Sequence, residues 1–317
     1  MSYRAEKVKQ MRKVRRWKRL LLLFLVAVIA SLCVFTTFYP AASWKYYFSL
    51  PSVEKRQEGE LRIHFLEVGQ GDCTLVEFPD GKTMLVDGGS PYAKNVDYVL
   101  RYLNALKIKR LDFLVVTGNA SNRSGSLTEI AAYKEIGHVY FPTTDTKASE
   151  EYSAFLGAVG RKSIPSTTAK RYVELGSETN EGYRVVFLLP HSSAAGSSAL
   201  WIEWKGYGTL LCGDMTEAEE QQLFLDDMLG YFSAQGIRLS EQTSLLRMAN
   251  FGKATAYTQT FLEYLCPENT VISCLASGAF SPDEWTIPST STVYRTDRFG
   301  TVVASITETG LTVKTAK

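Results

Sequence analysis

The sequence predicts an α/β fold, in which two mixed β-sheets pack face to face with helices outside, preceded by one transmembrane helix. Three observations predict it. An uncharged apolar stretch, residues 20–39, follows a strongly basic N-terminal segment. From residue 61 onward strand signals dominate, and segments with helical spacing are inserted between them in both halves. Two layers of sheet covered by helices bury such a mixture of elements.

The N-terminal segment has the composition of a membrane anchor. Residues 20–38 contain only Ser31, Thr36 and Thr37 as polar members. As a helix this run is roughly 28 Å long, about the thickness of the hydrocarbon core of a bilayer. A cleaved signal peptide is the alternative, but its apolar region is usually roughly 7–15 residues long, and Pro40 lies in the small-residue site where cleavage would occur. We therefore expect an uncleaved, single-pass anchor.

The charges that flank this run predict its orientation. Residues 1–19 contain nine basic side chains and one acidic side chain, Glu6. Because cytoplasmic flanks are enriched in Lys and Arg, the N-terminus is expected in the cytoplasm and the main domain outside the cell membrane. The expected parts are a basic cytoplasmic tail (1–19), a transmembrane helix (20–39), a juxtamembrane linker (40–60) and the main domain (61–317). The basic tail either contacts anionic lipid or only sets the topology.

The main domain is acidic. Nine of the 35 basic residues and one of the 33 acidic residues lie in the tail, which leaves 26 basic and 32 acidic residues and a net charge of −6. An acidic domain is a poor general binder of phosphate backbones, so nucleic acid is not expected as a partner. None of the five cysteines forms a Cys-x-x-Cys pair, which argues against a zinc ribbon or a thioredoxin-type motif. Cys73 and Cys212 fall inside expected strands and are expected to be buried thiols, whereas the pairing of Cys266 and Cys274 stays open.

The first half of the main domain begins with three strands. They are expected at 62–68, 73–78 and 83–87, and the turn Pro79-Asp80-Gly81-Lys82 joins the last two. Residues 93–107 are expected to be helical because their apolar side chains recur on one face. A buried strand (111–116), a helix (124–136), a strand (139–141) and a helix (147–160) follow.

The second half repeats this alternation. Strands are expected near Ile164 and at 183–189, and a hairpin at 199–203 and 209–212. The helix expected at 216–229 starts with the capping-box pattern Thr216-x-x-Glu219. A strand (244–248), a helix (256–265), a strand (270–275) and a C-terminal hairpin (301–305 with 311–315) complete the domain.

The loop after the buried strand at 111–116 has an unusual sequence. Residues 117–125 read Thr-Gly-Asn-Ala-Ser-Asn-Arg-Ser-Gly. This placement resembles the signature of the metallo-β-lactamase superfamily, in which a buried strand ends in Thr-His-x-His-x-Asp-His-x-Gly. The flanking Thr117 and Gly125 remain. The His positions hold Gly118, Ala120 and Arg123, and the Asp position holds Asn122.

Further motifs extend the resemblance over residues 61–315. The chain is similar to the soluble hydrolase-like domain of competence (ComEC-type) proteins at 64–73, 85–89, 111–117, 210–214 and 294–301, in that order. Glu67 takes the place of the Asp usual in the first motif. The resemblance implies a metallo-β-lactamase-type αββα sandwich and, in intact members, a hydrolase with two zinc ions.

The resemblance also identifies the former metal-site positions. Of the ligands that the superfamily uses, only Asp214 keeps a metal-binding side chain, and the later His-His-Gly motif reads Asn250-Phe251-Gly252. The three histidines do not supply a replacement set. His64 is expected on a strand face and His138 just before a strand, while His191 follows a strand end from which it could reach the former site. A guanidinium at position 123 also disfavours a divalent cation there, so no metal or other cofactor is expected.

These observations favour a metal-free pseudoenzyme that acts as a binding or scaffold module outside the membrane. The residues expected at its mouth are Asp72, Asp87, Arg123, His191 and Asp214, and an anionic group, an envelope component or a partner protein is expected to bind there. Two alternatives stay open. One is a residual metal-dependent hydrolase that uses Asp214 and His191, and the other is an accessory to DNA uptake or to nucleic-acid handling in the envelope, by analogy with competence proteins.

Overall fold

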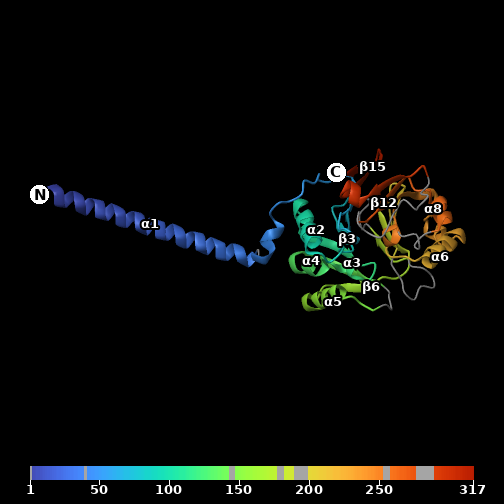
Figure 1. Ribbon diagram of the computed structural model, residues 1–317, viewed down its shortest axis with the longest axis horizontal. Coiled ribbons are helices and arrows are strands. Elements are labelled where there is room, and N and C mark those ends of the chain that lie inside the picture. Colours follow the sequence, from blue (N-terminus) through green and yellow to red (C-terminus); the bar gives the residue numbers. More distant parts are fainter. Residues whose placement is uncertain are drawn as a thin grey trace. The chain divides into compact units, whose positions relative to one another are not determined.

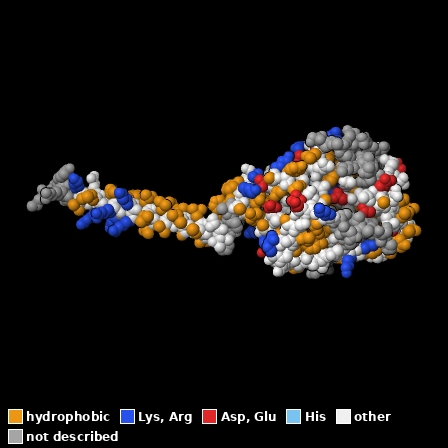
Figure 2. Space-filling view, turned by 60° about the horizontal axis from the view of Figure 1, so that its bottom comes forward, with side chains coloured by type: hydrophobic (Ala, Val, Ile, Leu, Met, Phe, Trp, Pro, Cys, Tyr) orange, Lys and Arg blue, Asp and Glu red, His pale blue; other side chains and the backbone are white. Residues whose placement is uncertain are grey.

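The N-terminal helix forms a unit of its own. The computed structural model describes residues 2–38, 41–142, 147–176, 182–188, 199–252, 258–275 and 289–317. The chain divides into two compact units, Met1–Ser49 and Leu50–Lys317. The first unit consists of one continuous helix, α1 (Ser2–Phe38), and a short 3-10 helix, η1 (Ala41–Tyr46). The span Lys7–Thr37 contains an 18-residue window with a mean hydropathy of 2.7, and by length and composition it could cross a membrane. Figure 2 shows basic side chains towards the start of this helix and hydrophobic side chains along the rest.

The second unit contains two mixed β-sheets. The first has eight strands in the order β15-β14-β1-β2-β3-β4-β5-β6. Their bounds are β1 (Leu61–Phe65), β2 (Thr74–Glu77), β3 (Thr83–Val86), β4 (Arg110–Val115), β5 (Glu135–Phe141), β6 (Ser166–Thr168), β14 (Val302–Thr307) and β15 (Gly310–Thr315). Strands β3 to β6 pair in parallel, and the other pairs are antiparallel.

The second sheet has seven strands in the order β13-β12-β11-β10-β9-β8-β7. Their bounds are β7 (Glu174–Gly176), β8 (Arg184–Leu188), β9 (Ala199–Trp204), β10 (Tyr207–Leu211), β11 (Thr243–Arg247), β12 (Asn269–Ile272) and β13 (Thr292–Arg295). Strands β10 to β13 pair in parallel, and β7 to β10 are antiparallel. Each sheet therefore combines a parallel part with an antiparallel part.

One hydrophobic core joins the two sheets. Alternate residues of β1, such as Ile63 and Phe65, share a buried cluster with Leu200 and Ile202 of β9. The intervening Arg62 and His64 face the other side of the first sheet, because successive side chains of a strand point to opposite faces. A second buried cluster lies between the second sheet and its helices and includes Trp201, Leu246 and Phe261.

Helices cover the outer faces of both sheets. The longer ones are α2 (Ala93–Ala105), α4 (Leu127–Tyr133), α5 (Glu150–Lys162), α6 (Glu217–Met228) and α8 (Gln259–Leu265). Figure 1 shows α2, α4 and α5 beside the first sheet and α6 and α8 beyond the second. The short elements are α3 (Ser121–Ser124), η2 (Ser233–Gln235), α7 (Leu239–Gln242), η3 (Ala249–Gly252) and α9 (Thr296–Phe299). The second unit is thus an αββα sandwich, which confirms the predicted fold class.

The structure corrects some predicted boundaries. The helix expected at 124–136 consists of α3 and α4, and its last two residues belong to β5, where Glu135 pairs with Arg110 of β4. His138 therefore lies inside β5, not before it. Cys73 and Cys212 lie one residue outside β2 and β10, and both are buried free thiols. Strands β7 and β13 were not predicted. Residues 50–60, expected in the linker, belong to the second compact unit.

Candidate functional site

The candidate site lies where strands of both sheets end. Asp87 directly follows β3, and Arg123 lies in α3, in the connection that follows the parallel neighbour β4. In the second sheet, Asp214 lies shortly after β10, and Arg247 is the last residue of the parallel neighbour β11. Carboxyl ends of neighbouring parallel strands meet at one edge of a sheet, which explains why these residues come together. With Asp72, which lies between β1 and β2, they form what we call the Arg123 cluster.

Arg123 is fully buried at the centre of this cluster. Its Nε donates to Asp214 Oδ2 at 2.9 Å, and its Nη2 donates to Asp214 Oδ1. Its Nη1 lies 3.3 Å from Asp87 Oδ2 and is also paired with Asp72. One guanidinium thus contacts three carboxylates from three different segments. Its planar, forked donors suit such a role better than the single ammonium group of lysine.

Arg247 is a second buried cation, which the sequence analysis did not identify. Its Nη2 forms an ion pair with Asp72 Oδ2, and its Nη1 donates to the carbonyl oxygen of Gly213 at 3.5 Å. Asp72 therefore lies between two guanidinium groups. The sequence contained one signal for this residue, since it is a charged residue within the apolar run Leu245-Leu246-Arg247-Met248. Buried charges are rarely left unpaired, so a partner could have been expected.

Asp87 is held by Thr117, which lies in the same loop as Arg123, as well as by Arg123 itself. The backbone N–H of Thr117 donates to Asp87 Oδ1 at 2.8 Å, and the Thr117 hydroxyl donates to Oδ2 at 2.6 Å. Burial raises the pKa of Asp87 well above its ordinary value, the hydrogen bonds from Thr117 lower it, and the negative charge of Asp214 raises it. Both Asp87 oxygens thus accept from Thr117, and Oδ2 also accepts from Arg123.

The remaining former metal-site positions border the cluster. A Cβ atom added at Gly118 would lie 3.7 Å from Asp214 Oδ2 and 3.8 Å from Arg123 Cγ. Ala120 and Asn122 contribute backbone carbonyls, which accept from Arg123 N at 3.1 Å and from Asp72 N at 3.2 Å. Their methyl and amide side chains stand where the superfamily signature has His and Asp.

The segment after β11 covers Arg123 with an aromatic ring. The ring of Phe251 is centred 5.2 Å from Arg123 Cζ, a cation–π distance, and Phe251 is buried. Asn250 and Phe251 both have positive φ, 44° and 60°, which is uncommon for residues other than glycine. The Asn250 N–H donates to Gly213 O at 3.0 Å, which ties this segment to the loop that carries Asp214.

His64 and His138 lie apart from these contacts. His64 in β1 is buried between Tyr102 and Glu77, and burial lowers its pKa. His138 in β5 contacts the Thr167 hydroxyl of β6 at 2.9 Å. His191, predicted at the mouth, lies outside the described residues. Within the described ranges, no group of three or more His, Cys, Asp or Glu side chains is arranged to hold a metal ion.

Comparison with known proteins gives the class of this fold and site. The model of the metallo-beta-lactamase superfamily matches residues 66–273, which is more than half of the chain, and the chain belongs to that superfamily. It is also 21% identical over 240 residues to ComE operon protein 3 of Bacillus subtilis (strain 168), a match that covers 68% of this chain but only 28% of that protein.

Two solved structures are similar in fold. YhfI, a metallo-beta-lactamase fold protein from Bacillus subtilis, has a TM-score of 0.49 and 13% identity, covering 74% of this chain and 96% of its own. CmlA, a diiron beta-hydroxylase from Streptomyces venezuelae, has a TM-score of 0.44 and 15% identity, covering 69% and 45% respectively.

Proposed function

We propose that this protein is a metal-free member of its superfamily, anchored in the cell membrane by α1 with its main domain outside, where it acts as a binding or scaffold module. The observation that carries the proposal is the position of Arg123, whose guanidinium lies among Asp72, Asp87 and Asp214. A positive charge of the protein itself thereby neutralises carboxylates that would otherwise attract a metal cation.

The side chains present do not fit two zinc ions. A zinc hydrolase needs His and carboxylate ligands that converge on the metal and leave a position open for water. The positions that correspond to three of the histidines hold Gly118, Ala120 and Arg123. Both carboxylate oxygens of Asp214 already accept from Arg123. A divalent ion would also be repelled by the two guanidinium groups of the Arg123 cluster.

The exposed part of the cluster indicates the kind of partner. Arg123 and Arg247 are buried and paired, whereas 28% of the Asp214 side chain is exposed. A ligand that approaches the cluster therefore meets a carboxylate rather than a free cation. This favours a partner protein or an envelope component with polar or basic groups over a small anion. The net charge of −6 outside the tail opposes nucleic acid in the same way.

The proposed orientation rests on the asymmetry of charge around the apolar run. The nine basic residues of the tail all precede the uncharged stretch, and the segment after it lacks a comparable basic cluster. The positive-inside rule then places the tail in the cytoplasm and the sandwich outside.

Activity assays on the full-length chain in detergent test the loss of catalysis. We expect no hydrolysis of a phosphodiester or a β-lactam above the blank, with or without added Zn²⁺ or Mn²⁺, and no difference between wild type and Asp214→Ala. Asp297→Ala is the control, because Asp297 pairs with Arg295 outside the Arg123 cluster. Hydrolysis that Asp214→Ala abolishes and Asp297→Ala retains would establish a residual hydrolase. Salt-sensitive binding of DNA would instead support a role in nucleic-acid handling.

A further inference from the structure

A second candidate site lies on the face of the first sheet that points away from the core between the sheets. A pocket of about 220 Å³ is bordered by β1, β14 and β15, by helix α2, and by residues 51–54 of the segment that follows the anchor unit. Arg62, Val303 and Ser305 line it from the sheet, on the face opposite to the core residues Ile63 and Ala304. None of the lining residues belongs to the Arg123 cluster, so this pocket is independent of the proposed function.

Aromatic and aliphatic side chains form part of the walls of the pocket. Tyr98 and Tyr102 of α2 line it together with Val53 and Val303. The Tyr98 hydroxyl is 2.8 Å from Thr301 Oγ1, and the Tyr102 hydroxyl is 2.9 Å from His64 Nδ1. Both phenol groups are therefore engaged within the protein. Tyr102 is only 2% exposed, so the ring of Tyr98 and the side chains of Val53 and Val303 form the apolar surface that a ligand would contact. Such apolar walls with a few polar groups are typical of small-molecule sites.

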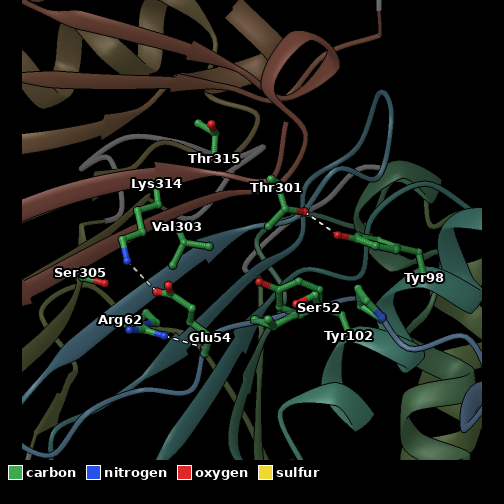
Figure 3. Close-up of a pocket in the computed structure, with 13 residues that line it drawn as sticks. Ser52, Glu54, Arg62, Tyr98, Tyr102, Thr301, Val303, Ser305, Lys314 and Thr315 are labelled. Atoms are coloured by element: carbon green, nitrogen blue, oxygen red, sulfur yellow. Dashed lines mark hydrogen bonds and ion pairs between the residues drawn. The ribbon is translucent and has the colours of Figure 1, made fainter.

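A cation and a carboxylate meet at the rim. Lys314 Nζ donates to Glu54 Oε2 at 2.7 Å, and about two-thirds of each side chain is exposed (66% and 67%). Figure 3 shows Glu54 between Lys314 and Arg62, with Tyr98 bonded to Thr301 on the other side of the view. The backbone at Glu54 is held separately, because Arg62 Nη1 donates to its carbonyl oxygen at 2.7 Å. The Glu54 carboxylate can therefore leave Lys314 while the segment stays in place.

We propose that this pocket binds a small monocarboxylate with an apolar or aromatic body, whose carboxylate replaces that of Glu54 on Lys314. The existing ion pair already demonstrates that a carboxylate fits opposite Lys314. Because exposed ion pairs contribute little net free energy, exchanging one carboxylate for another costs little. Burial of the ligand body against Tyr98, Val53 and Val303 then supplies the affinity. The volume lies below the roughly 300–1,000 Å³ of drug-sized sites, which limits the ligand to about one ring with a short chain.

Calorimetric titration of the full chain in lipid nanodiscs tests this site. The probe is 3-phenylpropionate, and its neutral analogue is 3-phenylpropanamide. We expect saturable binding of the acid, at least about fivefold tighter than that of the amide. Glu54→Gln should tighten binding of the acid by about threefold or more, because it removes the internal competitor for Lys314. Lys314→Met should abolish the difference between acid and amide.

Lys317→Met is the matched control. Lys317 forms the same kind of exposed ion pair, with Glu67 at 2.9 Å, three residues further along the chain and outside the pocket lining. It should leave both affinities within about twofold of wild type. Equal binding of acid and amide, an equal effect of Lys314→Met and Lys317→Met, or no saturable binding to either wild type or Glu54→Gln would each overturn the proposal.

Discussion

Arg123 and Asp214 form a forked ion pair that joins the two sheets of the sandwich. Nε of Arg123 is 2.9 Å from one carboxylate oxygen of Asp214, and Nη2 donates to the other. Arg123 comes from the loop after β4 in the first sheet, and Asp214 from the loop after β10 in the second. In the superfamily signature that the sequence resembles, the Asp at this position is a metal ligand. In this protein the Asp214 carboxylate instead accepts from the Arg123 guanidinium.

Removing Arg123 should destabilise the domain strongly. Arg123→Ala leaves Asp72, Asp87 and Asp214 with Arg247 as their remaining buried countercharge, and breaking a buried ion pair on one side typically costs about 3–5 kcal/mol. Arg123→Lys should recover only part of this loss, because an ammonium cannot donate as a fork. Chemical denaturation followed by near-ultraviolet circular dichroism measures the effect.

Arg184→Ala is the control for this substitution. Arg184 pairs with Glu174 at 3.0 Å, but both side chains are partly exposed. Its loss should cost less than about 1 kcal/mol. Similar losses for Arg123→Ala and Arg184→Ala would mean that the cluster does not hold the two sheets together.

The pair between Arg247 and Asp72 should show energetic coupling. A double-mutant cycle with Arg247→Met and Asp72→Asn is expected to give a coupling free energy of about 1–3 kcal/mol, because the two groups are buried and in contact. Asp226→Asn provides the comparison, since Asp226 pairs with Arg171 in a different part of the fold. The effects of Arg247→Met and Asp226→Asn should add. Additivity in the first cycle as well would rule out a direct interaction in solution.

The sequence predicted the strands and helices around this site better than the side-chain contacts within it. The alternation of apolar residues and the turn at Asp80-Gly81 were sufficient for β2 and β3, and a nearly continuous apolar run was sufficient for β4. The capping box was also confirmed, with Thr216 and Glu219 bonded reciprocally at the start of α6. These features are local. At the C-cap of α4, by contrast, buried Lys134 makes contacts that are distant in sequence: its Nζ donates to Asn104 Oδ1 and Ile108 O, both at 2.6 Å.

Local sequence patterns also do not predict which residues form ion pairs within the Arg123 cluster. Arg123 could be assigned to a former ligand position from its loop, but nothing in the loop indicates which carboxylates it contacts. Arg247 was not predicted to lie in the site, because its position within the strand expected at 244–248 does not indicate a partner. Its partner Asp72 is distant in sequence, and a single chain offers no signal that links the two.

Stability should fall as the pH rises through the pKa of Glu220. This buried carboxylate of α6 accepts from the backbone N–H and hydroxyl of Thr258, the N-cap of α8, at 2.9 and 2.7 Å. Burial raises its pKa from 4.5 to about 7, although the bonds from Thr258 lower it. The folded state therefore holds this proton more tightly than the unfolded state. The resulting stability is fully present below about pH 4.5 and is lost as the pH rises through about 7.

Comparison with Glu220→Gln isolates this effect. Between about pH 5 and 8 the free energy of unfolding of the wild type should fall by up to about 2.5 kcal/mol more than that of the variant. The raised pKa of Asp87 acts in the same direction but is common to both proteins, so it cancels in the difference. Parallel curves for the two proteins would show that Glu220 does not titrate in this range.

The proposed topology predicts which cysteine reacts on intact cells. Cys266, an exposed free thiol of the sandwich, should react with a membrane-impermeant maleimide, and Cys266→Ser should lose the label. In that background Ser2→Cys should be labelled only after lysis, because the tail is expected in the cytoplasm. Labelling of Ser2→Cys on intact cells, with none at Cys266, would reverse the orientation.

The zinc content of the full-length chain, purified without chelators from zinc-supplemented cells and measured by mass spectrometry, tests the central claim most directly. With Arg123 bound to Asp72, Asp87 and Asp214, we expect well under about 0.1 zinc ion per chain, because a dinuclear site needs ligands that these residues no longer provide. One or two zinc ions per chain, lost on Asp214→Ala, would contradict the account.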